Sequence, residues 1–250
     1  TGAKPGHALK IVSPQWQADP EVVQASCLKE HAAFQYAGDG LKRDRSFVLQ
    51  LVSRVGASLE YASADLQHDE EVVKAAVSNH GHSLRYASKS LQDNKQVVLA
   101  AVSQAAFALD HASDRLKDDI DVVLAAISRH EPGRVVTNLL LPIASERLQN
   151  DSAVALAAVL KEPKEYFHLG PQLKDDKQIV MAAVSSEKHA FRKASERLQR
   201  DPDVVMAASK WITSEPVQEP FALRLSRYAN GLAREDQSLL DPESSGPDFE

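Results

Sequence analysis

Cysteine and histidine are the residues of this sequence best able to do chemistry, and the chain has one of the first and nine of the second. A thiolate can attack as a nucleophile or bind zinc, and imidazole can bind zinc or transfer protons. The His-x3-His, His-Glu-x-x-His and Cys-x-x-Cys spacings of zinc sites do not occur in the sequence. The neighbouring histidines His80, His82 and His111 do not have these spacings either. The sequence also has no Gly-rich phosphate loop and no Gly-x-Ser-x-Gly motif. It therefore predicts no catalytic residue, no metal ligand and no cofactor.

A second group of side chains recurs at a fixed interval and suits binding. Tyr36, Tyr61 and Tyr86 lie 25 residues apart, and His111 follows at the same interval. Stacked aromatic residues can line a binding groove, because tyrosine offers contact area at a low cost in conformational entropy. The interpretation that we favour is that these rings cover the gaps between successive short helices, with their hydroxyl groups in water. All four remain candidate partner-binding residues.

The 25-residue period runs through most of the chain and is its strongest signal. An Asp or Asn recurs three residues before a pair of apolar residues, and we call it the anchor. The anchors are Asp19, Asp44, Asp69, Asn94, Asp119, Asp151, Asp176 and Asp201, with one spacing of 32 after Asp119. A large apolar residue stands three positions before each anchor: Trp16, Leu41, Leu66, Leu91, Leu116, Leu148, Leu173 and Leu198.

Each anchor is interpreted as a helix N-cap, because its side-chain oxygen can accept hydrogen bonds from the free N–H groups of the first turn. The apolar residues after it form one face of an α-helix, and Cys27 lies on that face as a buried structural thiol. Gly56 and Gly81 are natural stops for this helix. A second, shorter helix follows. The expected fold is therefore an all-α solenoid, or superhelix, of about eight two-helix repeats of 25 residues.

A polar column lies two residues before the anchors, at Gln67, Gln92, Lys117, Gln149, Lys174 and Gln199. We interpret these side chains as solvated, because they flank the apolar columns without belonging to them. The change Gln67→Ala should then alter the free energy of unfolding by less than about 0.5 kcal/mol.

The unit from Leu59 to Val77 reads Leu-x-Tyr-Ala-Ser-x-x-Leu-x-x-Asp-x-x-Val-Val-x-Ala-Ala-Val and returns almost unchanged from Leu84 to Val102. It resembles a bacterial helical-repeat family known as a domain of unknown function, number 4116, over roughly residues 6–209. Members of that family look like repeat regions of larger bacterial proteins, including some secreted effectors, and also occur in algae. The resemblance implies a bacterial origin and a role in holding a bacterial or host protein.

Departures from the period set the expected domain boundaries. Residues 1–18 should form an N-terminal half-repeat, and residues 19–208 the solenoid, with a seven-residue insertion near 130–143. Residues 209–234 should form a degenerate C-terminal capping region, because the pattern decays there. The acidic residues 235–250, without Lys or Arg, predict a disordered tail.

The net charge of −6 comes entirely from residues 235–250, so the rest of the chain is neutral on balance. A neutral body argues against nucleic-acid binding, which needs an excess of Lys and Arg. No stretch approaches the roughly 20 apolar residues of a membrane-spanning helix, so no membrane insertion is expected. A single cysteine fits a reducing compartment, which predicts a monomer in the cytoplasm or, for a secreted effector, in a host cytosol.

These observations favour a non-catalytic protein–protein interaction scaffold, a region of a larger protein that holds a protein or peptide. Insertions in solenoids map to loops on one face, often the binding face. The insertion therefore supplies further candidate partner-binding residues: His130, Glu131, Arg134, Val135 and Val136. A surface loop without a role is an equally simple interpretation, since long loops cost little free energy. The alternative function is part of an enzyme, with a site at the 130–143 insertion or at the 209–230 break.

Overall fold

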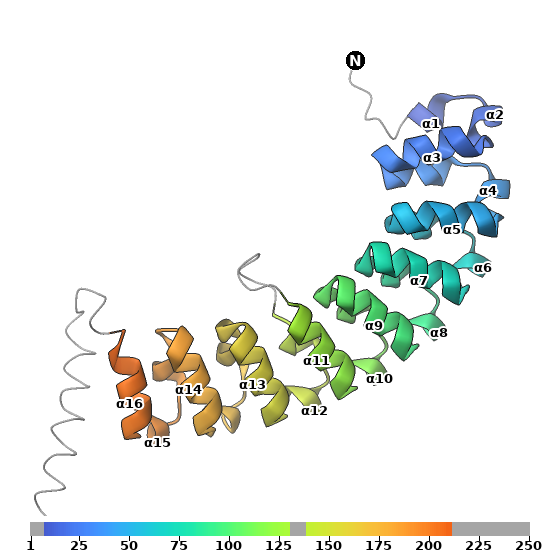
Figure 1. The fold of residues 1–250 in the computed structure, drawn as a ribbon. Helices are drawn as coiled ribbons and strands as arrows, with labels where there is room; N and C mark the ends of the chain where they lie inside the picture. Colours follow the sequence, from blue (N-terminus) through green and yellow to red (C-terminus); the bar gives the residue numbers. More distant parts are fainter. Residues whose placement is uncertain (1–7, 131–138, 212–250) are drawn as a thin grey trace, which may run out of the picture. The chain divides into compact units, whose positions relative to one another are not determined.

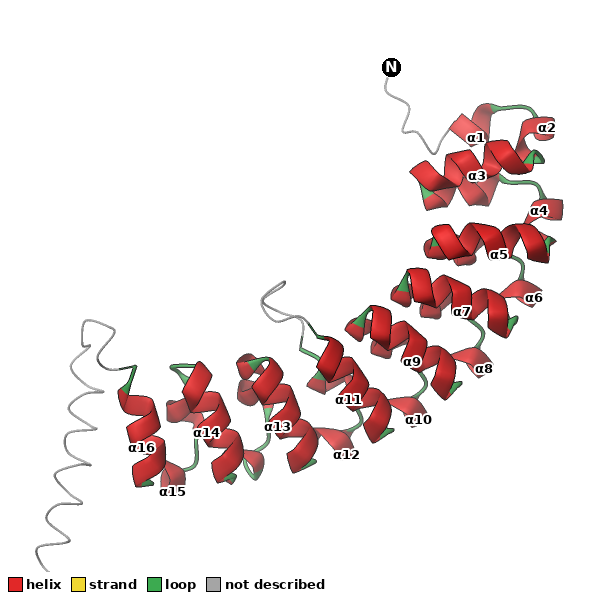
Figure 2. Ribbon diagram, in the orientation of Figure 1, coloured by secondary structure: helices red, strands yellow, loops and turns green. Residues whose placement is uncertain are grey.

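The computed structural model describes residues 8–130 and 139–211, and every regular element in these ranges is a helix (Figures 1 and 2). Residues 1–7, residues 131–138 of the insertion and residues 212–250, which include most of the expected capping region and the acidic tail, lie outside the described residues. None of the described helices is long and apolar enough to cross a lipid bilayer. The chain divides into two compact units, Thr1–Leu169 and Gly170–Glu250, which are described separately.

One repeat of the first unit shows the local architecture. A one-turn helix, α6 (Ala64–Gln67), leads into the ten-residue helix α7 (Glu70–Asn79), and the 3₁₀ helix η4 (Gly81–Tyr86) follows. The predicted second helix is thus a 3₁₀ helix, closed by bonds between residues three apart, such as Ser83 N–H to the His80 carbonyl at 2.8 Å. Short helical runs commonly take this form. The predicted turn before the anchor is itself the one-turn helix α6.

The remaining elements follow the same plan, and together the repeats form an all-α solenoid. The short helices of the first unit are α1 (Ala8–Ile11), α2 (Pro14–Gln17), α4 (Asp39–Arg43), α8 (Lys89–Gln92), α10 (Asp114–Lys117) and α12 (Glu146–Gln149). Its long helices are α3 (Pro20–Lys29), α5 (Arg45–Arg54), α9 (Lys95–Gln104), α11 (Ile120–Arg129) and α13 (Ser152–Lys161). Its 3₁₀ helices are η2 (His31–Tyr36), η3 (Gly56–Tyr61), η5 (Ala106–His111), η6 (Leu141–Ile143) and η7 (Pro163–His168). The second unit consists of η8 (Leu173–Asp175), α14 (Lys177–Ser186), η9 (Ala190–Lys193), α15 (Glu196–Gln199) and α16 (Pro202–Ser209).

The anchors cap the long helices, as the sequence predicts. In α7 one carboxylate oxygen of Asp69 accepts the N–H groups of Glu71 and Val72, both at 3.0 Å. All eight anchors, Asn94 included, accept at least one such bond. Each cap pairs N–H groups that would otherwise have no partner in the first turn of a helix.

The core follows the predicted apolar columns, and among their described apolar members only Trp16 is exposed. Cys27 is 1% exposed, which confirms that it is buried, and burial raises the pKa of its thiol to about 12. Trp16 stands in a column whose other members are buried, yet it is 48% exposed. Trp16 lies in α2, just before the first anchor. No described repeat precedes α2 to cover the ring.

The long helices of the first unit lie side by side in one row, and the 3₁₀ helices form a second row beside it (Figure 1). Two glycines permit the close spacing. A Cβ atom on Gly56 would lie 2.3 Å from the carbonyl oxygen of Ala76 on the next long helix, and one on Gly81 would lie 2.5 Å from that of Ala101. The long helices stop before these glycines, as the sequence predicts: α5 ends at Arg54 and α7 at Asn79, two residues before Gly56 and Gly81. Each glycine also begins a 3₁₀ helix where two backbones nearly touch, which the sequence did not predict.

The polar column before the anchors is structural and not merely solvated. The Gln67 amide donates to the carbonyls of Leu59 and Glu60, at 3.0 and 3.2 Å, near the end of η3. Its backbone carbonyl accepts the N–H of Ser88 in the next repeat at 2.9 Å. Gln67→Ala is therefore not expected to be nearly neutral. Removing the amide leaves two carbonyls of the 3₁₀ helix without that donor and should lower the free energy of unfolding.

Gln92, which is 7% exposed, offers the clearest test of this column. Its amide donates to the carbonyls of Leu84 and Arg85 at 3.1 and 3.2 Å. We expect Gln92→Ala to lower the free energy of unfolding by about 1–3 kcal/mol, because partly buried carbonyls lose their donor. The matched change Gln96→Ala, on the exposed side of α9, should stay within about 0.5 kcal/mol. Urea unfolding of both variants measures the difference, and equal losses would contradict the structural role of the column.

Gly56 and Gly40 form a second matched pair. A methyl group at Gly56 would overlap the Ala76 carbonyl oxygen, whereas nothing lies within 4 Å of one at Gly40 in α4. Gly56→Ala should therefore destabilise the protein by about 1–3 kcal/mol through overpacking. Gly40→Ala should stabilise it by about 0.5–1 kcal/mol, because alanine favours a helix. Thermal unfolding decides the matter: a Gly56→Ala protein as stable as the parent would show that the two rows can separate at little cost.

Candidate partner-binding surface

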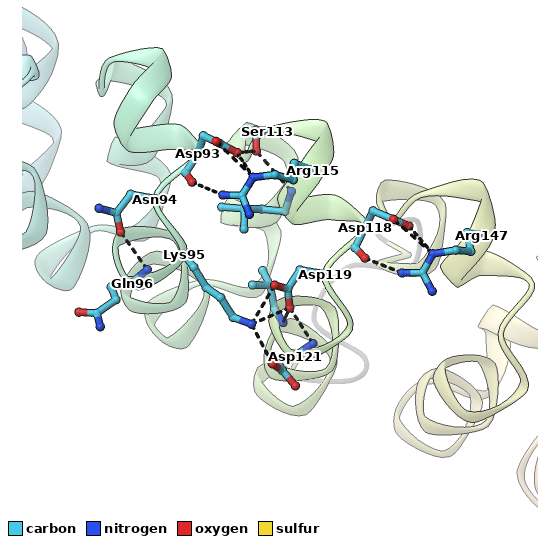
Figure 3. A network of polar contacts seen from close by, with 12 residues as sticks. Asp93, Asn94, Lys95, Gln96, Ser113, Arg115, Asp118, Asp119, Asp121 and Arg147 are labelled. Atoms are coloured by element: carbon cyan, nitrogen blue, oxygen red, sulfur yellow. Dashed lines mark hydrogen bonds and ion pairs between the residues drawn. The ribbon is translucent and has the colours of Figure 1, made fainter.

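Several charged residues at the N-terminal ends of the long helices form ion pairs between repeats. The Lys95 ammonium lies 2.8 Å from both Asp119 and Asp121 of the next repeat (Figure 3). Arg45 bonds Asp69 and Glu71 in the same way, at 2.7 and 2.5 Å. In the second unit Lys177 repeats the pattern with Asp201 and Asp203. The hydrogen bond from Arg45 holds the pKa of the Asp69 carboxyl below its usual value.

A second set of ion pairs joins the short helices. Asp93 accepts from the Arg115 guanidinium at 3.0 Å and from the Ser113 hydroxyl, and Arg115 also donates to the Asp93 carbonyl at 2.7 Å (Figure 3). The pair of Asp118 and Arg147 repeats this geometry, as does a pair in the second unit. Exposed pairs stabilise little individually. Their consequence for function is that these charges already have partners within the chain.

The tyrosine row lies on the 3₁₀ helices. Tyr36, Tyr61 and Tyr86 are the last residues of η2, η3 and η4, and all three are half-buried. The Tyr86 hydroxyl donates to the Glu60 carboxylate of the preceding repeat at 2.7 Å. The Arg85 guanidinium donates to that hydroxyl and lies 4.4 Å from the centre of the ring. The Tyr86 hydroxyl is thus tied to the neighbouring repeat, so the expectation that it reaches only water needs correction.

Histidine replaces tyrosine at the end of η5. The His111 ring lies 5.8 Å from that of His82, which lies 5.8 Å from His80. Burial lowers the pKa of His80 and of His111. Within residues 8–130 and 139–211, no cluster of His, Cys, Asp and Glu is arranged to hold a metal ion. The contact between His82 and His111 joins two successive repeats.

A cavity of about 530 Å³ opens beside His111. Arg85 and Lys89 line it from η4 and α8, while Asp110, Asp114 and Lys117 line it from η5 and α10. The sequence argument missed all five, although one signal was available. In this repeat two columns change together, because His111 replaces a tyrosine and Lys117 replaces a glutamine.

The insertion contributes one described candidate. His130 is 8% exposed, and its ring packs edge-on against Phe107 with 5.4 Å between ring centres. Burial lowers its pKa. Its backbone N–H pairs with carbonyls at the end of α11, so this residue ends the helix and offers little surface to a partner. The other four candidates, Glu131, Arg134, Val135 and Val136, lie outside the described residues.

Glu165 binds the backbone of the residues that follow the undescribed part of the insertion. One oxygen of its carboxyl group accepts the N–H groups of Leu140 and Leu141 at 2.6 and 3.2 Å. The side chain is 2% exposed, and its second oxygen has no hydrogen-bond partner within the described part of the chain. Burial raises the pKa of Glu165. The sequence signal for it is a column of small residues, Ala33, Ser58, Ser83 and Ala108, in which Glu165 alone is charged.

The comparisons with known proteins support the repeat assignment. The model of the family described as domain of unknown function DUF4116 matches five segments of the chain. Four of them overlap, at residues 19–67, 44–92, 69–115 and 94–131, and the fifth covers residues 176–212. Together these segments cover more than half of the chain. No curated protein and no solved structure matches this chain. The starts of the matched segments fall on the anchors Asp19, Asp44, Asp69, Asn94 and Asp176, and the chain belongs to the DUF4116 family.

Proposed function

We propose that this chain is a non-catalytic interaction scaffold that holds an extended protein or peptide segment along the 3₁₀ helices of its first unit. One observation carries the proposal. Half-buried rings of Tyr36, Tyr61, Tyr86 and His111 end four successive 3₁₀ helices, and a charged cavity opens beside the last of them. Partly covered aromatic residues on a rigid support lose little entropy when a partner covers them, which favours their use in binding.

The period of the stack also favours an extended partner. Successive 3₁₀ helices contact one another from η2 to η5, so each repeat presents an equivalent ring to the same side. A segment in extended conformation could meet one ring after another, as partners of helical repeat proteins commonly do. In our proposal the chain is a monomeric region of a larger bacterial protein, acting in the cytoplasm or, for a secreted effector, in a host cytosol.

The long helices offer a competing surface. Leu160 on α13 is 66% exposed, and Ile120 on α11 is 40% exposed. Ala125 and the exposed Ser128, on the same helix as Ile120, have small side chains that offer little contact area. Large aromatic residues are prominent in binding energy at interfaces, and the half-buried Tyr36, Tyr61 and Tyr86 lie on the 3₁₀ helices. We therefore assign the partner to the tyrosine row, and a test must compare both surfaces.

The enzymatic alternative has one observation in its favour, the buried Glu165. A carboxyl group with a raised pKa is a possible general acid, and perturbed pKa values are common at active sites. Its bonds to the N–H groups of Leu140 and Leu141 give it a structural role that needs no chemistry. We therefore propose that Glu165 holds the chain after the insertion in place.

The scaffold proposal is tested by variants on the two surfaces. A displayed peptide library is selected on the full chain, and bound peptides are measured again by fluorescence anisotropy. The double variant Tyr36→Ala, Tyr61→Ala should weaken their binding by about tenfold or more, because it removes two aromatic contacts. The control Leu160→Ala should change affinity by less than about twofold. Circular dichroism checks that both proteins are folded. A loss confined to Leu160→Ala would place the partner on the long helices, and the absence of any selected peptide would argue against a peptide scaffold.

The structural role of Glu165 is tested through pH. Its pKa in the folded protein lies above the unfolded value, so its contribution to stability is complete below the unfolded pKa and is lost as pH rises through the folded pKa. The variant Glu165→Gln keeps an accepting oxygen and cannot ionise. We expect its stability relative to the parent to increase as pH rises from the ordinary glutamate pKa to the raised pKa of the folded protein. Urea unfolding over that range measures the difference, and a constant difference would mean that Glu165 is not buried as a carboxyl group.

A further inference from the structure

The cavity beside His111 is lined by charged groups of both signs. Lys117, the last residue of α10, contributes a half-buried side chain. The exposed cations Arg85 and Lys89 come from η4 and α8. The exposed carboxylates Asp110 and Asp114 come from η5 and α10. Such a lining is suited to a ligand that carries both signs.

Other repeats use this position for a structural contact. Gln67 and Gln92 occupy it in the two preceding repeats, and each donates to two carbonyls of its own 3₁₀ helix. Gln149 also donates to carbonyls, at 2.8 Å to Ala144. Lysine stands here in two other repeats, as Lys42 and Lys174, and the Lys42 ammonium donates to the Gln35 carbonyl at 2.7 Å. For the Lys117 ammonium no such bond is found among the described residues, and its side chain lines the cavity instead.

The cavity cations also differ from others in the first unit. Arg45, Lys95 and Arg115 are held in ion pairs with the neighbouring repeat. Lys89 donates only to the Gln92 amide oxygen at 3.0 Å, and neither it nor Lys117 has an ion pair within the described part of the chain. Two ammonium groups therefore face one cavity without a carboxylate partner, which leaves them available to a ligand.

We propose that this cavity binds an acidic side chain of the extended partner segment, a Glu or Asp that lies over Lys117 between Arg85 and Lys89. Asp110 and Asp114 then contact a basic residue a short distance along the same segment. This inference rests on the proposed scaffold function and gives the partner its chemistry: a peptide with an acidic residue followed by a basic one. A free phosphate fits less well, because its higher charge would face the two carboxylates.

The experiment uses the full chain and short dye-labelled Gly-Ser peptides with the centre Glu-Glu-Ser-Lys or Gln-Gln-Ser-Lys, measured by fluorescence anisotropy. Lys117→Gln installs the residue that the neighbouring repeats use, so the variant should fold and be at least as stable as the parent in thermal unfolding. It should weaken binding of the acidic peptide by about tenfold or more, since the carboxylate loses its half-buried cation. Lys74→Gln, the same change at a half-buried position of α7 that does not line the cavity, should alter affinity by less than about twofold.

Three results would overturn the proposal. The peptides with Glu and Gln could bind equally, the Lys117→Gln variant could keep the parent's affinity, or inorganic phosphate could displace the acidic peptide as readily as unlabelled peptide does. The last result would show a general anion site. Peptides selected from the library distinguish failure of the cavity proposal from failure of the scaffold proposal. If they bind through the tyrosine row and ignore Lys117→Gln, the cavity proposal fails alone, whereas a library that yields no binder defeats both.

Discussion

A ten-residue helix is only marginally stable in water, because the cost of nucleation is spread over few residues, and the N–H groups of its first turn have no partner within the helix. The way the anchors pair those N–H groups shapes the rest of the structure. The Asp69 carboxylate caps α7 and also accepts Arg45 from the preceding repeat, so one group both starts a helix and joins it to its neighbour. Asp119 and Asp201 do the same with Lys95 and Lys177. Where Glu70 takes the position of Arg45, it pairs with Lys74 in its own helix, and the next anchor is the uncharged Asn94.

The sequence predicts this fold well, because the features that define it are periodic and local. Anchors, apolar columns and the burial of Cys27 all follow from residue type and spacing. Contacts between repeats were harder to anticipate. Gln67 looks like a surface residue unless one knows that a short 3₁₀ helix ends beside it with free carbonyls. Gly56 looks like no more than a helix stop until the next helix is placed against it. Both depend on distances in space that a pattern along the chain does not contain.

The candidate site could be predicted only in part, for a related reason. The tyrosines were visible because they repeat, whereas the cavity depends on residues that break the repeat. His111 and Lys117 each look like tolerated variation when a column is read alone. The structure brings both to one cavity with Arg85 and Lys89. In a repeat protein the regular positions maintain the stack, so a pair of irregular positions that meet in space marks a feature that the stack itself does not need.

The backbone bonds between repeats also have a direction. The Ser88 N–H donates to the carbonyl of Gln67, and the Ser113 N–H donates in the same sense to Gln92. Each later repeat therefore finds its acceptor already present on the earlier one. A chain that leaves the ribosome from its N-terminus can add repeats one at a time to a finished edge, without waiting for distant sequence. Duplication of one whole unit in the gene would preserve every such bond, which allows arrays of this kind to lengthen without redesign.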